Sequence, residues 1–207
     1  MERFESYHLA KSALNYREKK NMVKSKFAAR ELVLCSMFVA LIAVGAFIKI
    51  PIPVVPFTLQ FMFTMLAGLL LGGRLGAISV LGYIILGLAG MPIFTEGGGI
   101  SYLLKPSFGY IIGFCIASYV AGKIANQVEM PSLKRLLTAN FTGLVIVYTM
   151  GMLYYYIICN FVINTPIGLI PLFVYCFMLA VPGDIFLCIF SAYLARRIIP
   201  VRKRIFD

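Results

Sequence analysis

The stretch PFTLQFMFTMLAGLLLGGRLGAISVLGYIILGLAG, residues 56–90, decides how the chain can fold. As a single helix it would be about 50 Å long, which exceeds the ~30 Å hydrocarbon core of a bilayer. It contains the motif LGGRLG at residues 71–76, where two glycines and an arginine interrupt the apolar run. The stretch therefore predicts two short membrane helices joined at this turn.

Four other hydrophobic segments flank this stretch. They are, approximately, Leu32–Ile48, Pro106–Ile124 with a proline in its first turn, Leu136–Ile163 and Leu169–Ile199. The chain is 61% hydrophobic and 13% charged, whereas soluble domains are about half apolar and a quarter charged. We therefore expect an all-α membrane protein with six transmembrane helices in one bundle. The bundle spans residues 32–199, between a basic N-terminal segment (1–31) and a basic tail (200–207).

The basic residues predict which ends of these helices face the cytoplasm. Cytoplasmic loops of membrane proteins carry an excess of Lys and Arg. If the N-terminus is cytoplasmic, all 19 Lys and Arg residues fall inside except Lys49 and Lys105. An even number of helices returns the basic C-terminus to the same side. Both termini are thus predicted to be cytoplasmic, and the loops at residues 49–56 and 94–106 are predicted to face outside.

The basic N-terminal segment is too charged to be a secretory signal. We expect residues 1–31 to be a cytoplasmic segment without a specific function, and Met22 is an alternative start that would make residues 1–21 an upstream extension. A basic helix lying on membrane lipid is the other interpretation.

Several classes of function are disfavoured by the residues that the sequence lacks. Its net charge of +11 lies in loops and not on a soluble basic face, so nucleic-acid binding is not expected. It contains no G-x-x-x-x-G-K-[ST] motif, so an ATP-driven function requires a partner. The one histidine is His8, and the five cysteines lie in apolar runs without the spacing of metal or redox pairs. We expect neither a metal nor a cofactor.

One acidic residue, Asp184, lies inside the last apolar segment, in AVPGDIFLC (180–188). A carboxylate at this depth costs roughly 2.5–3.5 kcal/mol on insertion scales, so it is expected to face the bundle interior with a partner. Pro182 and Gly183 loosen the helix there. We interpret Asp184 as a ligand-binding or proton-linked carboxylate; a purely structural pairing is the alternative.

The two predicted outer loops supply further candidate binding residues. FTEGGGISYLLKPSFGY (94–110) combines three glycines, which allow close backbone approach to a ligand, with a lysine that favours an anion. Its aromatic residues either form pocket walls or belong to an ordinary interfacial belt. PIPVVPFTLQ (51–60) places two polar side chains at a helix start, as a pocket wall or as interhelical contacts. The candidates are Gly97, Gly98, Gly99, Lys105, Phe108, Tyr110, Thr58 and Gln60.

Three stretches together resemble the BioY family, the biotin-specific substrate-binding (S) components of energy-coupling-factor (ECF) transporters. They are PIPVVPFTLQ (51–60), GLAGMPIFTEGGGISYLLKPSFGYIIGF (87–114) and VPGD (181–184), and the resemblance covers about Leu32–Arg197. It implies a six-helix S component that binds biotin from outside, in the cytoplasmic membrane of a prokaryote. Its implied partners are a transmembrane coupling protein and two ATP-binding-cassette ATPases. Small residues on the first helix contact the coupling protein in the family, which implies that role for Ser36 and Ala40, spaced for close helix packing.

The match to the family pattern is incomplete at the ligand site. The matching positions are Asp184, Gly98, Gly99, Pro106 and Tyr110. Many members have Asn at the position of Gly97, Gly at that of Lys105 and Lys at that of Leu187. We therefore hypothesise that Asp184 accepts hydrogen bonds from the ureido N–H groups of biotin. Lys105 would pair with the valerate carboxylate, replacing the lysine absent at position 187.

Other functions stay open at this point. An S component for another vitamin or small carboxylate would share the same fold. An intramembrane enzyme using Asp184 would need a second acid or a histidine at membrane depth, and the sequence supplies neither. A structural or assembly subunit would show no saturable ligand binding. We expect a transport subunit and not an enzyme.

Overall fold

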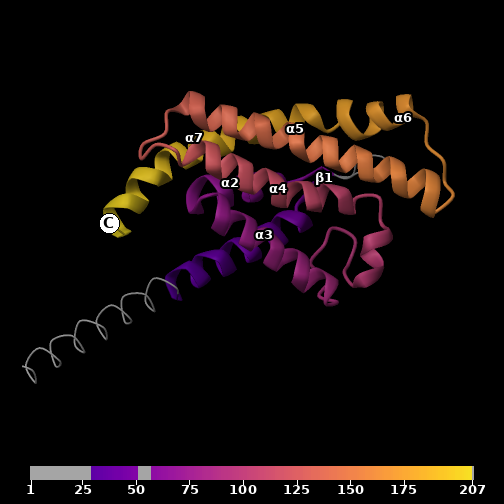
Figure 1. The fold of residues 1–207 in the computed structure, drawn as a ribbon, viewed down its shortest axis with the longest axis horizontal. Coiled ribbons are helices and arrows are strands. Elements are labelled where there is room, and N and C mark those ends of the chain that lie inside the picture. The colour runs from indigo at the N-terminus through magenta and orange to yellow at the C-terminus, as the bar shows by residue number, and fades with distance from the viewer. Residues whose placement is uncertain (1–28, 51–56, 207) are drawn as a thin grey trace, which may run out of the picture. The chain divides into compact units, whose positions relative to one another are not determined.

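A computed structural model describes residues 29–50 and 57–206, with side chains described as far as Val201 (Figure 1). Most of the predicted basic segment 1–31 and the proline-rich PIPVVP at residues 51–56 therefore lie outside the described residues. The chain divides into two units, Met1–Leu34 and Cys35–Asp207. The architecture below is that of the second unit, together with the start of its first helix, which begins at Ala29.

Helices account for most of the second unit (Figure 1). A first helix, Ala29–Phe47, leads into a two-residue antiparallel pair, β1 (Lys49–Ile50) with β2 (Phe57–Thr58). The remaining elements are α2 (Gln60–Leu71), α3 (Gly73–Leu88), the 3-10 helix η1 (Ile100–Leu104), α4 (Phe108–Ala125), α5 (Leu133–Ile157), the π-helix η2 (Ile158–Val162), α6 (Leu169–Phe173), the π-helix η3 (Val174–Met178) and α7 (Val181–Phe206).

Within the described residues, four helical segments are long and apolar enough to cross a membrane. They are Ala29–Phe47, Phe108–Ala125, Leu133–Val162 and Leu169–Val201. The two shorter apolar helices are α2 and α3, which occupy the long run that the sequence predicts to be divided. The chain is accordingly a multi-pass, mostly helical membrane protein.

Glycines allow α2, α3 and α4 to cross at backbone contact distance. Gly72 alone separates α2 from α3, with φ of +89°, a conformation that side chains rarely adopt. A Cβ added at Gly68 would lie 2.4 Å from the Ser118 carbonyl oxygen, and one at Gly122 would lie 2.3 Å from the Gly73 nitrogen. The LGGRLG motif thus provides both the turn and a close-packing surface.

The first helix buries one face and exposes the other. The buried residues recur at helical spacing and are Cys35, Phe38, Ile42 and Ala46. Ser36 and Ala40 lie on the exposed face. The helix therefore leaves its small-residue pair accessible, although their contact with a partner protein stays a prediction.

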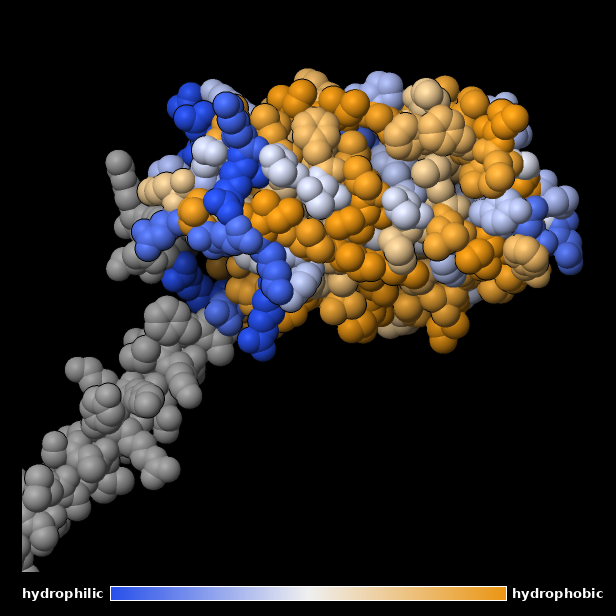
Figure 2. All heavy atoms as spheres, turned by 45° about the horizontal axis from the view of Figure 1, so that its top comes forward, coloured by the Kyte–Doolittle hydropathy of each residue, from blue (hydrophilic) through white to orange (hydrophobic). Residues whose placement is uncertain are grey.

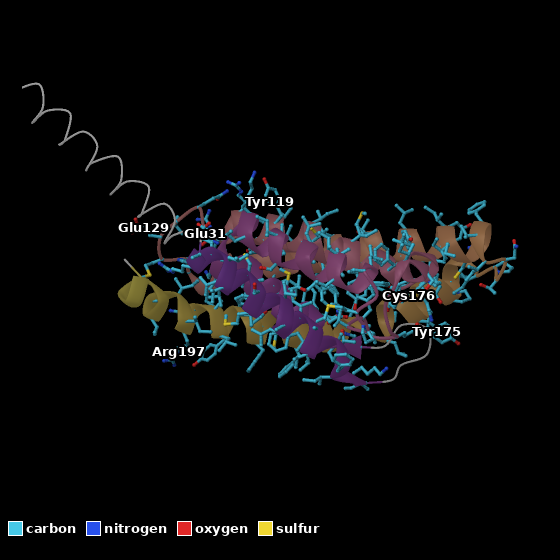
Figure 3. All side chains as sticks on the ribbon, turned by 90° about the horizontal axis from the view of Figure 1, so that it is seen from below. Glu31, Tyr119, Glu129, Tyr175, Cys176 and Arg197 are labelled. Carbon is cyan, nitrogen blue, oxygen red and sulfur yellow. The ribbon has the colours of Figure 1, made fainter. Side chains whose placement is uncertain are left out.

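Aromatic and basic residues mark one end of the bundle. The Lys123 ammonium lies 4.8 Å from the centre of the Tyr119 ring, and the Arg197 guanidinium lies over Tyr193. Such pairs are typical of a membrane–water interface. Figure 2 shows a broad hydrophobic surface on the face in view, with hydrophilic residues gathered at its ends. In Figure 3, Arg197 lies toward one end of the molecule and Cys176 toward the other.

Three boundaries differ from the sequence expectation. The fourth helix begins at Phe108, two residues after Pro106, and Lys105 before the proline is extended. The last segment is not one helix: α6 and η3 end at Met178, and α7 begins at Val181. At its other end α7 continues through Pro200, since a proline near the end of a long helix removes one backbone hydrogen bond without ending it.

Gly122→Ala should lower the melting temperature of the purified protein by several degrees. The new methyl group would collide with backbone atoms of α2 and α3, which cannot rotate away, at a cost of about 1–3 kcal/mol. Gly82→Ala is the matched control, because its methyl would meet only a Val39 methyl group at 3.2 Å. Equal melting temperatures for the two variants would contradict the proposed close crossing.

Candidate functional site

A cavity of about 60 Å³ lies between the helices near the end that carries the β1–β2 pair. It is smaller than the roughly 300–1,000 Å³ that small-molecule sites usually provide. A vitamin-sized ligand therefore requires lining groups or outer loops to move. The described residues that line it are Phe57, Thr58, Gln60, Phe61, Thr95, Tyr102, Ser107, Tyr110, Ile111, Phe114, Val147, Tyr148, Cys176, Ala180 and Asp184.

Asp184 is the acidic residue of this cavity wall. The helix break before Val181 places it in the first turn of α7, where the helix dipole favours a negative charge. Its Oδ2 accepts a hydrogen bond of 2.5 Å from the Tyr148 hydroxyl of α5. Gly183 beside it lets the Phe57 ring approach, since an added Cβ would lie 2.6 Å from that ring. The predicted partner of Asp184 is thus a tyrosine and not a cation.

Aromatic rings from three elements surround the carboxylate. Tyr110 of α4 and Tyr148 of α5 meet edge to face at 6.0 Å, and Tyr148 contacts Phe177 of η3 at 5.3 Å. The Tyr110 ring lies directly over Gly151, and its hydroxyl donates to the Cys176 carbonyl. A π-helical segment at Cys176 agrees with the frequent occurrence of π-bulges at functional sites.

Gln60 connects the cavity to the outer loops. Its side-chain amide donates to the Tyr83 hydroxyl at 2.6 Å, and its Oε1 accepts from Thr95 at 3.3 Å and from Thr58 at 3.4 Å. The Thr95 carbonyl in turn accepts from the Lys49 ammonium at 3.1 Å. Gln60 therefore holds the residue 93–97 loop against α2 as well as facing the cavity.

The three consecutive glycines shape the outer loop. Gly97 and Gly99 have φ of +114° and +98°, and a Cβ at Gly98 would lie 2.1 Å from the Met91 carbonyl oxygen. The N–H of Gly97 donates to Phe94, and that of Gly99 to Gly87. None of the three is among the described residues that line the cavity. Their contact with a ligand stays a prediction, and the loop conformation by itself requires glycine.

Lys105 forms an ion pair on the protein surface. Its ammonium lies 2.8 Å from the Glu96 carboxylate, and about half of each side chain is exposed. The hydrogen bond and charge of Glu96 raise the pKa of Lys105. Lys105 is not among the described lining residues. It would have to leave Glu96 in order to bind a ligand carboxylate.

Phe108 anchors the loop and does not line the cavity. It packs with Phe94 and Tyr102 in a buried aromatic cluster, in which the Phe94 and Tyr102 rings are 4.5 Å apart. Phe94 itself rests on Gly87, where an added Cβ would lie 2.1 Å from the ring. This cluster holds the loop in place, so that Thr95 and Tyr102 reach the cavity.

The cavity brings together four of the residues predicted from the sequence: Asp184, Tyr110, Gln60 and Thr58. It adds Tyr148 and Thr95, which sequence reasoning missed. Tyr148 is one of 12 tyrosines, and nothing in its neighbourhood in the chain distinguishes it. Its role follows from α5 lying beside α7, because only that contact brings its hydroxyl to Asp184.

The chemistry of the cavity suits a small, partly apolar molecule with N–H groups. One carboxylate accepts hydrogen bonds, hydroxyl and amide groups donate or accept them, and aromatic rings supply flat apolar surface. Burial raises the pKa of Tyr102, one of the lining residues. Among the described residues no group of three acidic, Cys or His side chains is placed to hold a metal ion.

Comparisons with known proteins agree on one family. The model of the BioY family matches residues 18–204. A protein named "Probable biotin transporter BioY" from Lysinibacillus sphaericus is 49% identical over 170 residues, or 82% of this chain and 87% of that protein. A "Biotin transporter BioY" from Thermotoga maritima is 40% identical over 123 residues, or 59% of this chain and 72% of that protein.

A solved structure has a similar fold. It is the crystal structure of the S component for biotin from an ECF-type ABC transporter. It superposes with a TM-score of 0.69 at 28% sequence identity, over 84% of this chain and 92% of that one.

Tyr148→Phe should lower the melting temperature of the ligand-free protein. The substitution leaves a half-buried carboxylate oxygen without its donor, which costs about 1–3 kcal/mol. Tyr119→Phe is the matched control, since the Tyr119 ring keeps its contact with Lys123 after the hydroxyl is removed. The assignment of Tyr148 as the partner of Asp184 is wrong if both variants melt like the parent.

Proposed function

The chain belongs to the BioY family, and on that premise we propose that it is the biotin-binding S component of a vitamin uptake transporter. The observation that carries the proposal is the cavity in which Asp184 faces aromatic rings and hydroxyl groups. Members of the family and the similar solved structure are named as transport components, so this reading is favoured over an enzyme that uses Asp184.

The chemistry of biotin matches the lining groups. Its ureido ring has two N–H donors, which the Asp184 carboxylate would accept in a water-poor cavity, with Tyr148 orienting that carboxylate. Its fused rings and valerate chain are apolar and would lie against Tyr110 and the neighbouring rings. The valerate carboxylate would project toward the outer loop, where Lys105 is the nearest proposed partner.

Transport would use partners, because the sequence lacks a phosphate-binding motif of its own. The proposed partners are a transmembrane coupling protein and two ATP-binding-cassette ATPases. The exposed pair Ser36 and Ala40 on the first helix is the proposed contact with the coupling protein, since small residues permit close helix approach.

The proposed setting is the cytoplasmic membrane of a prokaryote. Six helices would cross the bilayer with both termini inside, α2 and α3 being the short second and third spans. The distribution of Lys and Arg supports this orientation, since only Lys49 and Lys105 would lie outside. The cavity would then open outward, and membrane lipid would cover the exposed apolar residues.

Calorimetric titration of the purified protein with biotin, thiamine, riboflavin and pantothenate tests the ligand. We expect saturable binding of biotin and none of the other three. Asp184→Asn should weaken biotin binding by roughly tenfold to a hundredfold, the range for one charge-assisted hydrogen bond. Binding of another vitamin in place of biotin would show an S component of different specificity. If none of the four vitamins binds, the result would indicate a structural subunit and contradict the proposal.

A comparison of Lys105→Ala with Glu96→Gln separates two roles of the lysine. If Lys105 binds the valerate carboxylate, Lys105→Ala weakens biotin binding about tenfold, whereas Glu96→Gln frees the lysine and leaves affinity unchanged or higher. If the ion pair only anchors the loop, both substitutions change affinity equally. The biotin affinity of each variant, measured by calorimetry, distinguishes the two outcomes.

A further inference from the structure

Asn140 is a fully buried amide at the contact between α5 and α7, outside the cavity lining. Its Nδ2 donates two hydrogen bonds of 2.8 Å, one to the Cys188 carbonyl and one to the Ser191 hydroxyl. The Ser191 hydroxyl donates to the same carbonyl at 3.2 Å. The three groups close a small polar cluster, which we call the Asn140 cluster.

The amide has only one favourable orientation in this cluster. Reversing it would set its oxygen against the Cys188 carbonyl, and two acceptors repel. In the observed orientation Oδ1 has no hydrogen-bond partner among the described residues. A buried acceptor without a partner is unfavourable, so an apolar side chain of similar size would pack there at lower cost. Packing alone therefore does not account for Asn140, whereas fixing the position of α7 on α5 does.

The Asn140 cluster and the Tyr148–Asp184 hydrogen bond are two points along one helix contact. On α5 they are eight residues apart, or about 12 Å, and on α7 the Cys188 carbonyl lies one helical turn after Asp184. Residue numbers fall along α5 as they rise along α7, so the helices are antiparallel. The two points together define both the rotation and the height of α7 relative to α5.

We infer that Asn140 is a positioning residue for the ligand carboxylate: it fixes α7 on α5 and thereby holds Asp184 at the Tyr148 hydroxyl. Apolar packing through residues such as Leu187 and Ala192 holds α7 in the bundle but is not directional, whereas a second polar contact restricts the rotation of α7 about its axis and keeps Asp184 in the cavity wall. The second point removes this freedom before a ligand binds, and preorganisation of this kind raises affinity without adding a ligand contact. The inference rests on the proposed function, because the affected ligand is biotin.

The test is a double-mutant cycle of Asn140→Leu and Tyr148→Phe, with biotin affinity measured by calorimetry. Asn140→Leu alone should weaken binding at least about fivefold, since residues that act through a shared partner couple strongly. In the Tyr148→Phe background the same substitution should cost less than twofold, because the contact that it positions is already absent. Equal losses in both backgrounds would overturn the inference, as would unchanged affinity with a lowered melting temperature.

Two further variants keep the test decisive. Ser191→Ala is milder, removes one of the two acceptors and should weaken binding in the same direction as Asn140→Leu. Asn126→Leu is the control away from α7, because the Asn126 amide likewise donates two hydrogen bonds, in this case to the Leu69 carbonyl of α2 and the Gly122 carbonyl of α4. It should lower the melting temperature without changing biotin affinity.

The cycle also separates this inference from the proposed function. If the parent protein binds no biotin, the proposed function is wrong. The positioning role is then decided by melting temperatures of the ligand-free variants. If the melting temperature of the Asn140→Leu, Tyr148→Phe double variant falls by less than the sum of the two single losses, the positioning role is supported. A fall equal to that sum overturns it.

Discussion

A carboxylate inside an apolar helix bundle requires a hydrogen-bond donor, because an unpaired charge there is strongly unfavourable. In this protein the donor is Tyr148, and its contact with Asp184 determines much of the surrounding geometry. Asp184 lies in the first turn of α7, beside α5, and lines the cavity. A carboxylate in the first turn of a helix is favoured by the helix dipole.

The rest of the cavity depends on how the outer loops are tied to the helices. Gln60 and Lys49 both hold Thr95, and Phe94 rests in the space that Gly87 leaves. The triple glycine allows the chain to turn back at this point, and the N–H groups of Gly97 and Gly99 donate to Phe94 in the loop and to Gly87 in α3. The loop therefore contributes to the site through the residues it positions, as well as through any direct contact with a ligand.

The two short helices, α2 and α3, also cross α4 at backbone contact distance. α2 and α3 have 12 and 16 residues, and they meet α4 where glycines remove side chains from the contact. The cavity, in contrast, is lined by larger side chains, among them Phe57, Tyr110 and Tyr148.

The sequence by itself determined the helical class, the division of residues 56–90 at the LGGRLG motif and the presence of an acidic residue, Asp184, inside an apolar segment. These follow from local properties, namely hydrophobic length, glycine content and the cost of a charge in an apolar segment. It also singled out Tyr110, Gln60 and Thr58, which line the same cavity as Asp184, and their contact with a ligand stays a prediction.

Only the tertiary structure decided which polar side chains pair with one another. Tyr148 and Asp184 are 36 positions apart, and Asn140 and Ser191 are 51 apart. Only the packing of α5 on α7 brings them together, and no local pattern encodes that contact. The pairing of Lys105 with Glu96 likewise follows from the path of the loop between them. Hydrophobic periodicity specifies which segments become helices, whereas side-chain contacts between distant helices specify which polar groups meet.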